Sequence, residues 1–286
     1  MAVLLLALGS AFFIGLNNVL TRKALDFTSR GQAILVSLGV ATTIFLVLNA
    51  VLGKIPLWFV PGALLFFLGG LFGPGIGRTF NVISAKRIGV SRTIPVVGTA
   101  PFFATILAIL FLGEEYSFYI FLGMAFIVFG IFVLSRGKKE NGKRAFDKKD
   151  LLLPLGSAVC GGVSIVVSKV ALGILDDPIV GVGLTMVGAL LVVLGYIVGT
   201  RRVRHFRVMH RGSIFPVLGG FCMAAAFFLN FSALQIGDVS IVAPVFSTFP
   251  LFGVFLSHFF LKEEITGRTW LGAIIIVLGI AIIQAF

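Results

Sequence analysis

Eight polar or ionisable side chains lie within otherwise apolar stretches of the chain, where they could bind a solute. An ionisable or amide group in hydrocarbon is costly unless it faces a cavity or a partner, so each one is a candidate binding residue. The candidates are Asn17, Asn18, Arg78, Asn81, Thr99, Asn230, Thr248 and His258. Their side chains predict substrate binding by hydrogen bonds and, at Arg78, by charge.

Each candidate also has a purely structural interpretation. Arg78 could extend toward the nearby basic connection and keep its charge at the membrane surface, or it could bind an anion. Asn81 and Asn230 could join helices by hydrogen bonds or contact a substrate. His258 lies near a predicted helix end, where an interfacial histidine is the alternative to a proton relay. The threonines can donate to their own backbone.

Four prolines occupy matching places in two related segments and predict local breaks in two helices, because each proline removes a backbone hydrogen bond. They are Pro95, Pro101, Pro244 and Pro250. Their paired placement favours a gating role, although membrane helices also tolerate proline without one. The segment GGLFGPGIGR at 69–78 predicts close helix packing or a broken helix, and its spacing does not match a phosphate-binding loop.

Acidic residues are absent from the middle of the apolar stretches. All eleven Asp and Glu residues lie in polar connections or at the ends of apolar segments, so proton-coupled cation export is not predicted. No nucleophile turn, metallopeptidase motif or paired-aspartate motif occurs in these stretches, and the sequence predicts neither an enzyme nor a cofactor. We expect a facilitator or exchanger for neutral, zwitterionic or anionic metabolites, with Arg78 as the contact for an anion.

Membrane-spanning helices must position these residues. Of 286 residues, 58% are hydrophobic and 12% are charged, whereas about 25% are charged in ordinary soluble domains. The mean hydropathy is +1.12. Apolar blocks of about 20 residues, enough to cross a bilayer core about 30 Å thick, follow one another closely. Cys160 and Cys222 lie in such blocks and indicate neither a disulfide framework nor a thiolate metal site.

The chain contains the same unit twice. LLLALGSA at 4–11 recurs as LLLPLGSA at 151–158, and NVISAKRIGVSRTIPVVGTAPFF recurs at an offset of 149 as NFSALQIGDVSIVAPVFSTFPLF. A repeat of nearly 150 residues indicates a duplicated membrane domain, since solenoid units are much shorter. We therefore expect a first repeat at 1–135, a basic linker at 136–150 and a second repeat at 151–286.

Each repeat divides into five predicted helices, which gives an all-α membrane protein with ten transmembrane helices. The expected spans are about 3–21, 31–52, 60–83, 90–112, 117–135, 151–169, 179–199, 213–233, 239–261 and 267–285. Glycine, proline and charged residues occupy the breaks between them, as helix ends at a water interface require.

The distribution of basic residues predicts the orientation. Because five is odd, two repeats that fold alike must lie inverted relative to each other. Of the 23 lysines and arginines, 20 fall on odd-numbered connections, counting the linker, and 2 on even-numbered ones. The positive-inside rule then places the odd-numbered connections in the cytoplasm and both termini outside the cell membrane. The net charge of +12 reflects this loop topology.

The whole pattern resembles the EamA-type members of the drug/metabolite transporter superfamily: two five-helix units, each with a proline-containing fourth helix and a glycine-spaced fifth helix. The resemblance covers the chain and is strongest at 81–134 and 230–283. It implies ten helices in two inverted repeats, a central cavity and alternating access, and it leaves the substrate open. The small multidrug-resistance relatives carry a glutamate in their first helix, which this chain lacks. The expected partners are a small-molecule metabolite and the lipid bilayer, with no nucleic acid, and the chain is expected to be a monomer or homodimer.

Two pairs of adjacent glutamates, in FLGEEYS and FLKEEIT, mark helix boundaries. We expect Ser117 and Thr266 to begin the last helix of each repeat, and Glu114 and Glu263 to lie near the positive end of that helix dipole. The alternative is that these carboxylates bind protons or substrate.

Three further classes of function stay open from the sequence. A channel, a lipid scramblase or a non-transporting partner subunit would suit the repeat, and each would lack saturable counterflow of a small solute. A membrane enzyme is the second class. The third is nucleic-acid binding through RRVRHFRVMHR, but anionic lipid lies nearer than nucleic acid to a segment tethered at a membrane face.

Overall fold

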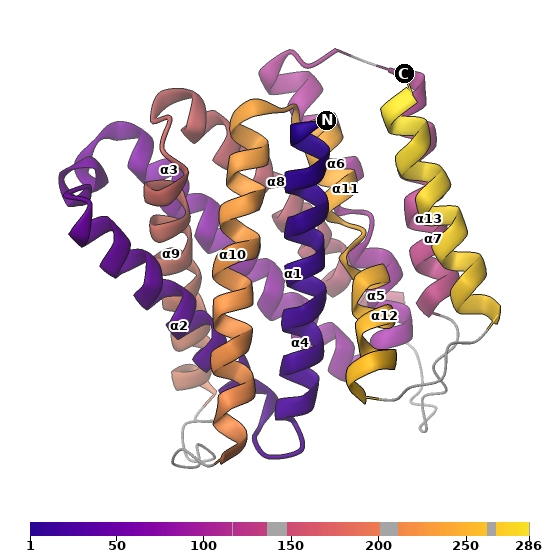
Figure 1. The fold of residues 1–286 in the computed structure, drawn as a ribbon, viewed down its shortest axis with the longest axis horizontal. Coiled ribbons are helices and arrows are strands. Elements are labelled where there is room, and N and C mark those ends of the chain that lie inside the picture. Colours follow the sequence, from indigo (N-terminus) through magenta and orange to yellow (C-terminus); the bar gives the residue numbers. More distant parts are fainter. Residues whose placement is uncertain (116, 136–147, 201–210, 262–266, 286) are drawn as a thin grey trace.

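The computed structural model is a bundle of helices, and every element in the part of the chain that it describes is helical (Figure 1). The described residues are 1–115, 117–135, 148–200, 211–261 and 267–285. In these residues eight helical segments are long and apolar enough to cross a membrane. Two shorter apolar helices, Phe118–Leu134 and Gly267–Ile283, accompany them. The all-α class expected from the sequence is confirmed.

The helices follow the expected spans, although three spans consist of more than one helical piece. The first half contains α1 (Ala2–Ala24), α2 (Arg30–Val51), η1 (Ile55–Phe59), α3 (Pro61–Gly70), η2 (Leu71–Gly77), α4 (Arg78–Arg87), α5 (Val90–Val97), α6 (Ala100–Leu112) and α7 (Phe118–Ser135). The second half contains η3 (Lys148–Leu151), α8 (Leu152–Ile174), α9 (Pro178–Gly199), η5 (Arg211–Ser213), α10 (Ile214–Ile236), α11 (Val239–Phe246), α12 (Phe249–Leu261) and α13 (Gly267–Ala285).

Several features expected from the sequence lie outside the described residues. They are most of the linker at 136–150, nearly all of RRVRHFRVMHR, and Glu263 and Thr266.

Helix ends follow from local chemistry. The Ser29 hydroxyl accepts a hydrogen bond from the Gln32 N–H at 3.3 Å and caps α2, while the Asp177 carboxylate accepts the N–H groups of Ile179 and Val180 and caps α9. Gly113 ends α6 with φ of 69°, a left-handed conformation that glycine adopts without strain.

Large apolar side chains cover much of the outer surface. Phe59, Phe111 and Phe259 are 86%, 75% and 75% exposed, and many leucine, isoleucine and valine side chains are exposed with them. Soluble monomers rarely expose large contiguous apolar areas, whereas lipid tails solvate them. The exposed surface therefore agrees with a multi-pass membrane protein.

The first helix of each half packs against the other half at corresponding residues. The Ser10 hydroxyl on α1 donates to the Ala226 carbonyl at 2.7 Å, and the Ser157 hydroxyl on α8 donates to the Gly77 carbonyl at 2.8 Å. Ser10 and Ser157 correspond at an offset of 147, and Gly77 and Ala226 at 149. The two halves thus exchange equivalent contacts, as expected for a pseudo-two-fold arrangement.

The last helices of the two halves, α7 and α13, lie side by side on the right of Figure 1 and touch through glycines. A Cβ on Gly123 would lie 2.6 Å from the Gly279 carbonyl oxygen, and one on Gly130 would lie 2.8 Å from that of Gly272. The paired positions run in opposite directions along the chain, so the two helices are antiparallel. Small residues at this spacing let helix backbones approach closely.

The start of α1 and the end of α13 both lie at the upper end of the bundle in Figure 1. The connection between α1 and α2 lies at the lower end, and the connection between α2 and α3 lies at the upper left.

Candidate functional site

Arg78 is the first residue of α4, and its guanidinium extends toward α10. One terminal nitrogen lies 3.6 Å from the Met223 sulfur, which is a weak acceptor. Within the described residues this is its only polar contact, and no carboxylate lies within ion-pair distance of it. A guanidinium carries five N–H donors in a planar fork, so most of its donors have no protein acceptor in this part of the chain.

The depth of this group distinguishes between the two interpretations of Arg78. Arg78 lies nine residues before Arg87, the end of α4, and Met223 lies nine residues after Ile214, the start of α10. At 1.5 Å per residue, Arg78 lies about 14 Å from the end of α4 at Arg87, and Met223 lies about 14 Å from the start of α10 at Ile214. Because the guanidinium meets Met223 at this level, its charge does not extend to the membrane surface.

A π-helical segment, η2, leads into Arg78 and contains one residue more than the matching part of α10. A Cβ on Gly70 would touch the Thr185 carbonyl oxygen, and one on Gly220 would touch that of Ser37, which makes Gly70 and Gly220 equivalent. Gly77 lies seven residues after Gly70. Ala226, the counterpart of Gly77, lies only six residues after Gly220. A π-helix accommodates such an extra residue and often occurs at functional sites.

Both ends of η2 pack on other helices. A Cβ on Gly70, just before η2, would meet Thr185 of α9, and one on Gly77, its last residue, would meet Ser157 and Cys160 of α8. The expectation of close packing at 69–78 is confirmed. The alternative of a broken helix is not, because the chain stays helical from α3 through η2, which contains Pro74, into α4.

Two asparagines flank the contact between Arg78 and Met223. Asn81 lies one turn after Arg78 on α4 and is partly exposed, and Asn230 lies two turns after Met223 on α10 and is 7% exposed. Neither amide has a hydrogen-bond partner among the described residues. Arg78, Asn81 and Asn230 therefore keep free hydrogen-bonding capacity within the described residues, and α4 meets α10 through the contact between Arg78 and Met223.

Asn17 and Asn18 on α1 differ in their surroundings. Asn17 is 2% exposed, accepts a hydrogen bond from the Thr21 hydroxyl at 3.4 Å and lies against Gly219 of α10, so it belongs to a helix contact. Asn18 is exposed, although Ala11, two turns earlier on the same side of α1, is fully buried. Other helices therefore cover this face of α1 at Ala11 but leave it exposed at Asn18.

The two fourth spans are interrupted at corresponding positions. In the first half the break lies at Gly98 and Thr99, between α5 and α6, and in the second half it lies at Ser247 and Thr248, between α11 and α12. The Thr99 hydroxyl donates to the Val96 carbonyl and the Thr248 hydroxyl donates to the Val245 carbonyl, each at 2.7 Å. Both threonines are therefore satisfied by their own backbone.

The four predicted prolines bracket these two breaks. Pro95 and Pro244 lie inside α5 and α11, and Pro101 and Pro250 lie in the first turn of α6 and α12. The predicted local breaks are present, because each proline removes a backbone donor on one side of the interruption.

His258 is exposed near the end of α12, with its ring 5.5 Å from that of Phe259. Phe259 and Phe260 are 75% and 59% exposed, so His258 lies among outward-facing apolar side chains. The structure does not bring it into the group around Arg78.

Glu114 has a role that the sequence did not predict. Its carboxylate accepts the N–H groups of Val239 at 2.7 Å and Ser240 at 2.9 Å, at the start of α11 in the other half. The expectation that the Glu114 carboxylate stabilises the start of the last helix of its own half was wrong. The end of α6 lies next to the start of α11, so Glu114 accepts hydrogen bonds from α11 instead. The carboxylate does lie near the positive end of a helix dipole, but that helix is α11.

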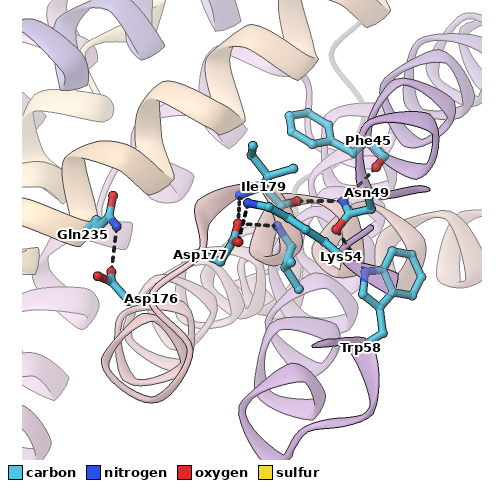
Figure 2. Close-up of polar contacts among 9 residues, drawn as sticks. Phe45, Asn49, Lys54, Trp58, Asp176, Asp177, Ile179 and Gln235 are labelled. Atoms are coloured by element: carbon cyan, nitrogen blue, oxygen red, sulfur yellow. Dashed lines mark hydrogen bonds and ion pairs between the residues drawn. The ribbon is translucent and has the colours of Figure 1, made fainter. Parts of the chain in front are cut away.

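A cluster of polar contacts joins the connection between α2 and α3 to the start of α9 in the other half, as Figure 2 shows. The Lys54 ammonium pairs with the Asp177 carboxylate. The Asn49 amide donates to the Phe45 carbonyl at 2.8 Å and to the Ile179 carbonyl at 3.1 Å. The Trp58 indole N–H donates to the Asn49 side-chain oxygen at 3.2 Å. We refer to Lys54, Asp177, Asn49 and Trp58 as the Lys54 cluster.

Nothing in the described residues resembles a metal centre. No group of three or more histidine, cysteine, aspartate or glutamate side chains converges there, and Cys160 and Cys222 are free thiols. The arrangement can offer hydrogen bonds and one positive charge to a solute.

Comparison with known proteins identifies the family. A sequence model of the EamA-like transporter family matches residues 1–136 and again residues 148–285. The chain belongs to the EamA-like transporter family. Both matched segments coincide with the two halves of the bundle, so the EamA fold is present here as two repeats of one chain.

One solved crystal structure, described only as "Crystal structure of protein", is similar to this EamA-family chain along almost its full length. The TM-score is 0.79 at 17% sequence identity, and the similarity covers 97% of this chain and 95% of the other. At this identity the similarity shows a shared fold. No curated protein matches the chain.

Proposed function

We propose that this EamA-family protein moves a small metabolite across the membrane by alternating access. The observation that carries the proposal is the matched pair of helix breaks, each packed on the first helix of the other half. A Cβ on Gly15 of α1 would lie 2.8 Å from the Phe252 side chain, and one on Gly162 of α8 would lie 2.8 Å from that of Phe103. Phe252 and Phe103 each follow a break by a few residues.

This arrangement suits a transporter because the two breaks occupy equivalent places in the two halves. If one half rocks against the other, each break can absorb the change in backbone angles while the helix beyond it stays packed. Pro95, Pro101, Pro244 and Pro250 are the proposed hinge residues.

The proposed topology has ten transmembrane helices in two five-helix repeats that are inverted relative to each other. The antiparallel pairing of α7 with α13, and the location of both chain ends at one end of the bundle, support it. The basic residues on odd-numbered connections support a cytoplasmic location for the opposite end of the bundle, with both termini outside the cell membrane.

The proposed substrate contacts are polar groups that have no amide or carboxylate partner within the described residues, namely the partly exposed Arg78 and Asn81, the exposed Asn18 and the buried Asn230. Thr99 and Thr248 lie at the breaks and could offer only their remaining acceptor capacity. Asn17 and His258 are less suited, since one is enclosed in a helix contact and the other faces outward. The function proposed is transport without catalysis, by a monomer or homodimer.

Counterflow in proteoliposomes tests this proposal. Vesicles preloaded with an unlabelled amino acid or dicarboxylate should accumulate the same labelled solute transiently, and uptake should saturate with concentration for at least one member of the panel. A channel or a scramblase would give no saturable counterflow. Pro95→Ala and Pro244→Ala should slow the exchange about tenfold, because a stiffened hinge raises the barrier between the two states.

The matched control for the hinge variants is Pro178→Ala. Pro178 occupies the first turn of α9 and does not lie at a break. Equal slowing by all three substitutions would argue against hinges at the breaks, and leakage without saturation in the parent protein would argue against a carrier.

A further inference from the structure

We propose that the transported metabolite carries an oxyanion, a carboxylate or a phosphate, which binds the Arg78 guanidinium. This inference rests on the proposed transport function and specifies its substrate class. Within the described residues the guanidinium has a thioether as its only polar partner. A charge at this depth is costly without a partner, and a planar fork of N–H donors matches the two oxygens of a carboxylate or phosphate.

The depth of Arg78 favours a solute over a lipid headgroup. Arg78 lies about 14 Å from the end of α4 at Arg87 and Met223 about 14 Å from the start of α10 at Ile214, whereas lipid phosphates lie in the headgroup region outside the hydrocarbon core. An oxyanion that reaches this level must enter between the halves.

The site is asymmetric, which gives it one charge. At the offset of 149, Arg78 corresponds to Phe227 of α10, so only the first half supplies a guanidinium. The extra residue in η2 is also confined to the first half and directly precedes Arg78. Asn81, one turn after Arg78 on α4, and Asn230, two turns after Met223 on α10, are the neutral hydrogen-bonding groups of the same two helices, which suits a small anion with further polar groups.

Ligand-dependent unfolding of the purified protein in non-ionic detergent tests the site. Malonate and inorganic phosphate, compared with chloride at equal ionic strength, should raise the midpoint temperature in a saturable manner for at least one of the two. Arg78→Gln should weaken that anion about tenfold or more, and Arg78→Lys should weaken it less, because lysine keeps the charge but loses the fork. Arg87→Gln is the matched control, since Arg87 lies on the same helix and pairs with Asp150 at 3.3 Å.

A second readout does not depend on unfolding. Phenylglyoxal should modify Arg78, located by mass spectrometry, and the bound anion should slow that modification about tenfold while leaving Arg87 unaffected. Met223→Leu keeps the packing and should leave anion binding intact.

The inference is overturned if neither anion protects the parent protein, if Arg78→Gln binds as tightly as the parent, or if only phosphatidylglycerol protects. Saturable counterflow of a neutral solute that survives Arg78→Gln would leave the transport function standing and remove the anion site alone.

A different observation carries a second inference: we infer that the Lys54 cluster closes one face of the transporter in this conformation. Lys54 and Asp177 belong to different repeats, and their side chains are 27% and 16% exposed. Asn49 adds a hydrogen bond between the halves at the same end, and Trp58 fixes the Asn49 amide. These contacts must separate if the halves part at this face.

The opposite face lacks an equivalent cluster in the described residues. Ser29 caps α2 where Asp177 caps α9, so the corresponding position has no carboxylate. The described ion pair at that end joins Arg87 to Asp150, and the Arg87 side chain is 58% exposed. A more exposed pair is more strongly screened, so among the described residues the ion pair at this face is the weaker of the two.

Cysteine labelling tests this closure. In a background with Cys160→Ala and Cys222→Ala, the Asn230→Cys thiol should react slowly with a membrane-impermeant maleimide applied at the face of the Lys54 cluster. Adding Lys54→Gln should speed the reaction about five- to tenfold, because one partly buried ion pair no longer holds the halves together. Asp177→Asn should act in the same direction while keeping an oxygen for the α9 cap.

Lys23→Gln is the control, because Lys23 pairs with Asp26 within a single connection at 3.6 Å. Unchanged labelling in Lys54→Gln and Asp177→Asn, or an equal increase in Lys23→Gln, would overturn the closure. Faster reaction from the other vesicle face alone would overturn it as well.

Discussion

Replacement of Gly70 by alanine is expected to lower the stability of the protein by about 3 kcal/mol, the upper part of the range for overpacked interiors. A Cβ at this position would lie 2.1 Å from the Thr185 carbonyl oxygen and 2.8 Å from the Thr185 Cα. The obstacle is backbone, so no side chain can move aside and α3 must separate from α9. The same separation would stretch the hydrogen bond from the Thr185 hydroxyl to the Phe66 carbonyl, which is 3.1 Å long.

The measurement is the midpoint of thermal unfolding in detergent together with the yield of monodisperse protein. Gly195→Ala is the matched control, because a Cβ there has no neighbour within 4 Å and Gly195 lies inside α9. That substitution should be neutral or stabilise by up to about 1 kcal/mol through helix propensity. A Gly70→Ala protein as stable as Gly195→Ala would mean that α3 and α9 do not pack as described.

Glu114→Ala is expected to destabilise the protein by about 2–3 kcal/mol, whereas Glu115→Ala should change stability by less than about 0.5 kcal/mol. The Glu114 carboxylate holds two N–H groups at the start of α11, and hydrogen bonds to a charged group are stronger than neutral ones. Glu115 is exposed and has no hydrogen-bond partner in the described part of the chain. Two adjacent glutamates in one connection thus provide a matched pair of variants.

Unfolding midpoints of the two variants, measured side by side in one detergent, check this prediction. Glu114→Gln should fall between them, since an amide oxygen can still accept one N–H without the charge. Equal behaviour of Glu114→Ala and Glu115→Ala would show that the contact between α6 and α11 contributes nothing to stability.

Much of the fold could be predicted from the sequence because apolar block length and internal repetition are strong signals. The expected spans coincide with helices, and the prolines at 95, 101, 244 and 250 marked both helix breaks. The partner of Glu114 could not be predicted, because a carboxylate beside one helix carries no information about which distant helix begins nearby in space. The same holds for Lys54 and Asp177, which are 123 residues apart.

The extra residue in η2 left a weak signal in the sequence. LGG at 68–70 aligns with LGG at 218–220 at an offset of 150, but the asparagines at 81 and 230 align at 149. Both alignments are correct, and the difference between them is the π-helical residue that precedes Arg78. Candidate residues such as Asn17 and His258 could not be separated from Arg78 without coordinates, because polarity alone does not reveal which way a helix face points.

The exchange of first helices between the halves has a consequence for biosynthesis. The hydroxyl of Ser10 meets the carbonyl of Ala226 across 216 residues of sequence. At synthesis rates of about 5–20 residues per second, Ala226 of α10 is synthesised roughly 10–40 s after Ser10 of α1. The packing of α1 in the native bundle is therefore completed only after α10 and α12 have been synthesised.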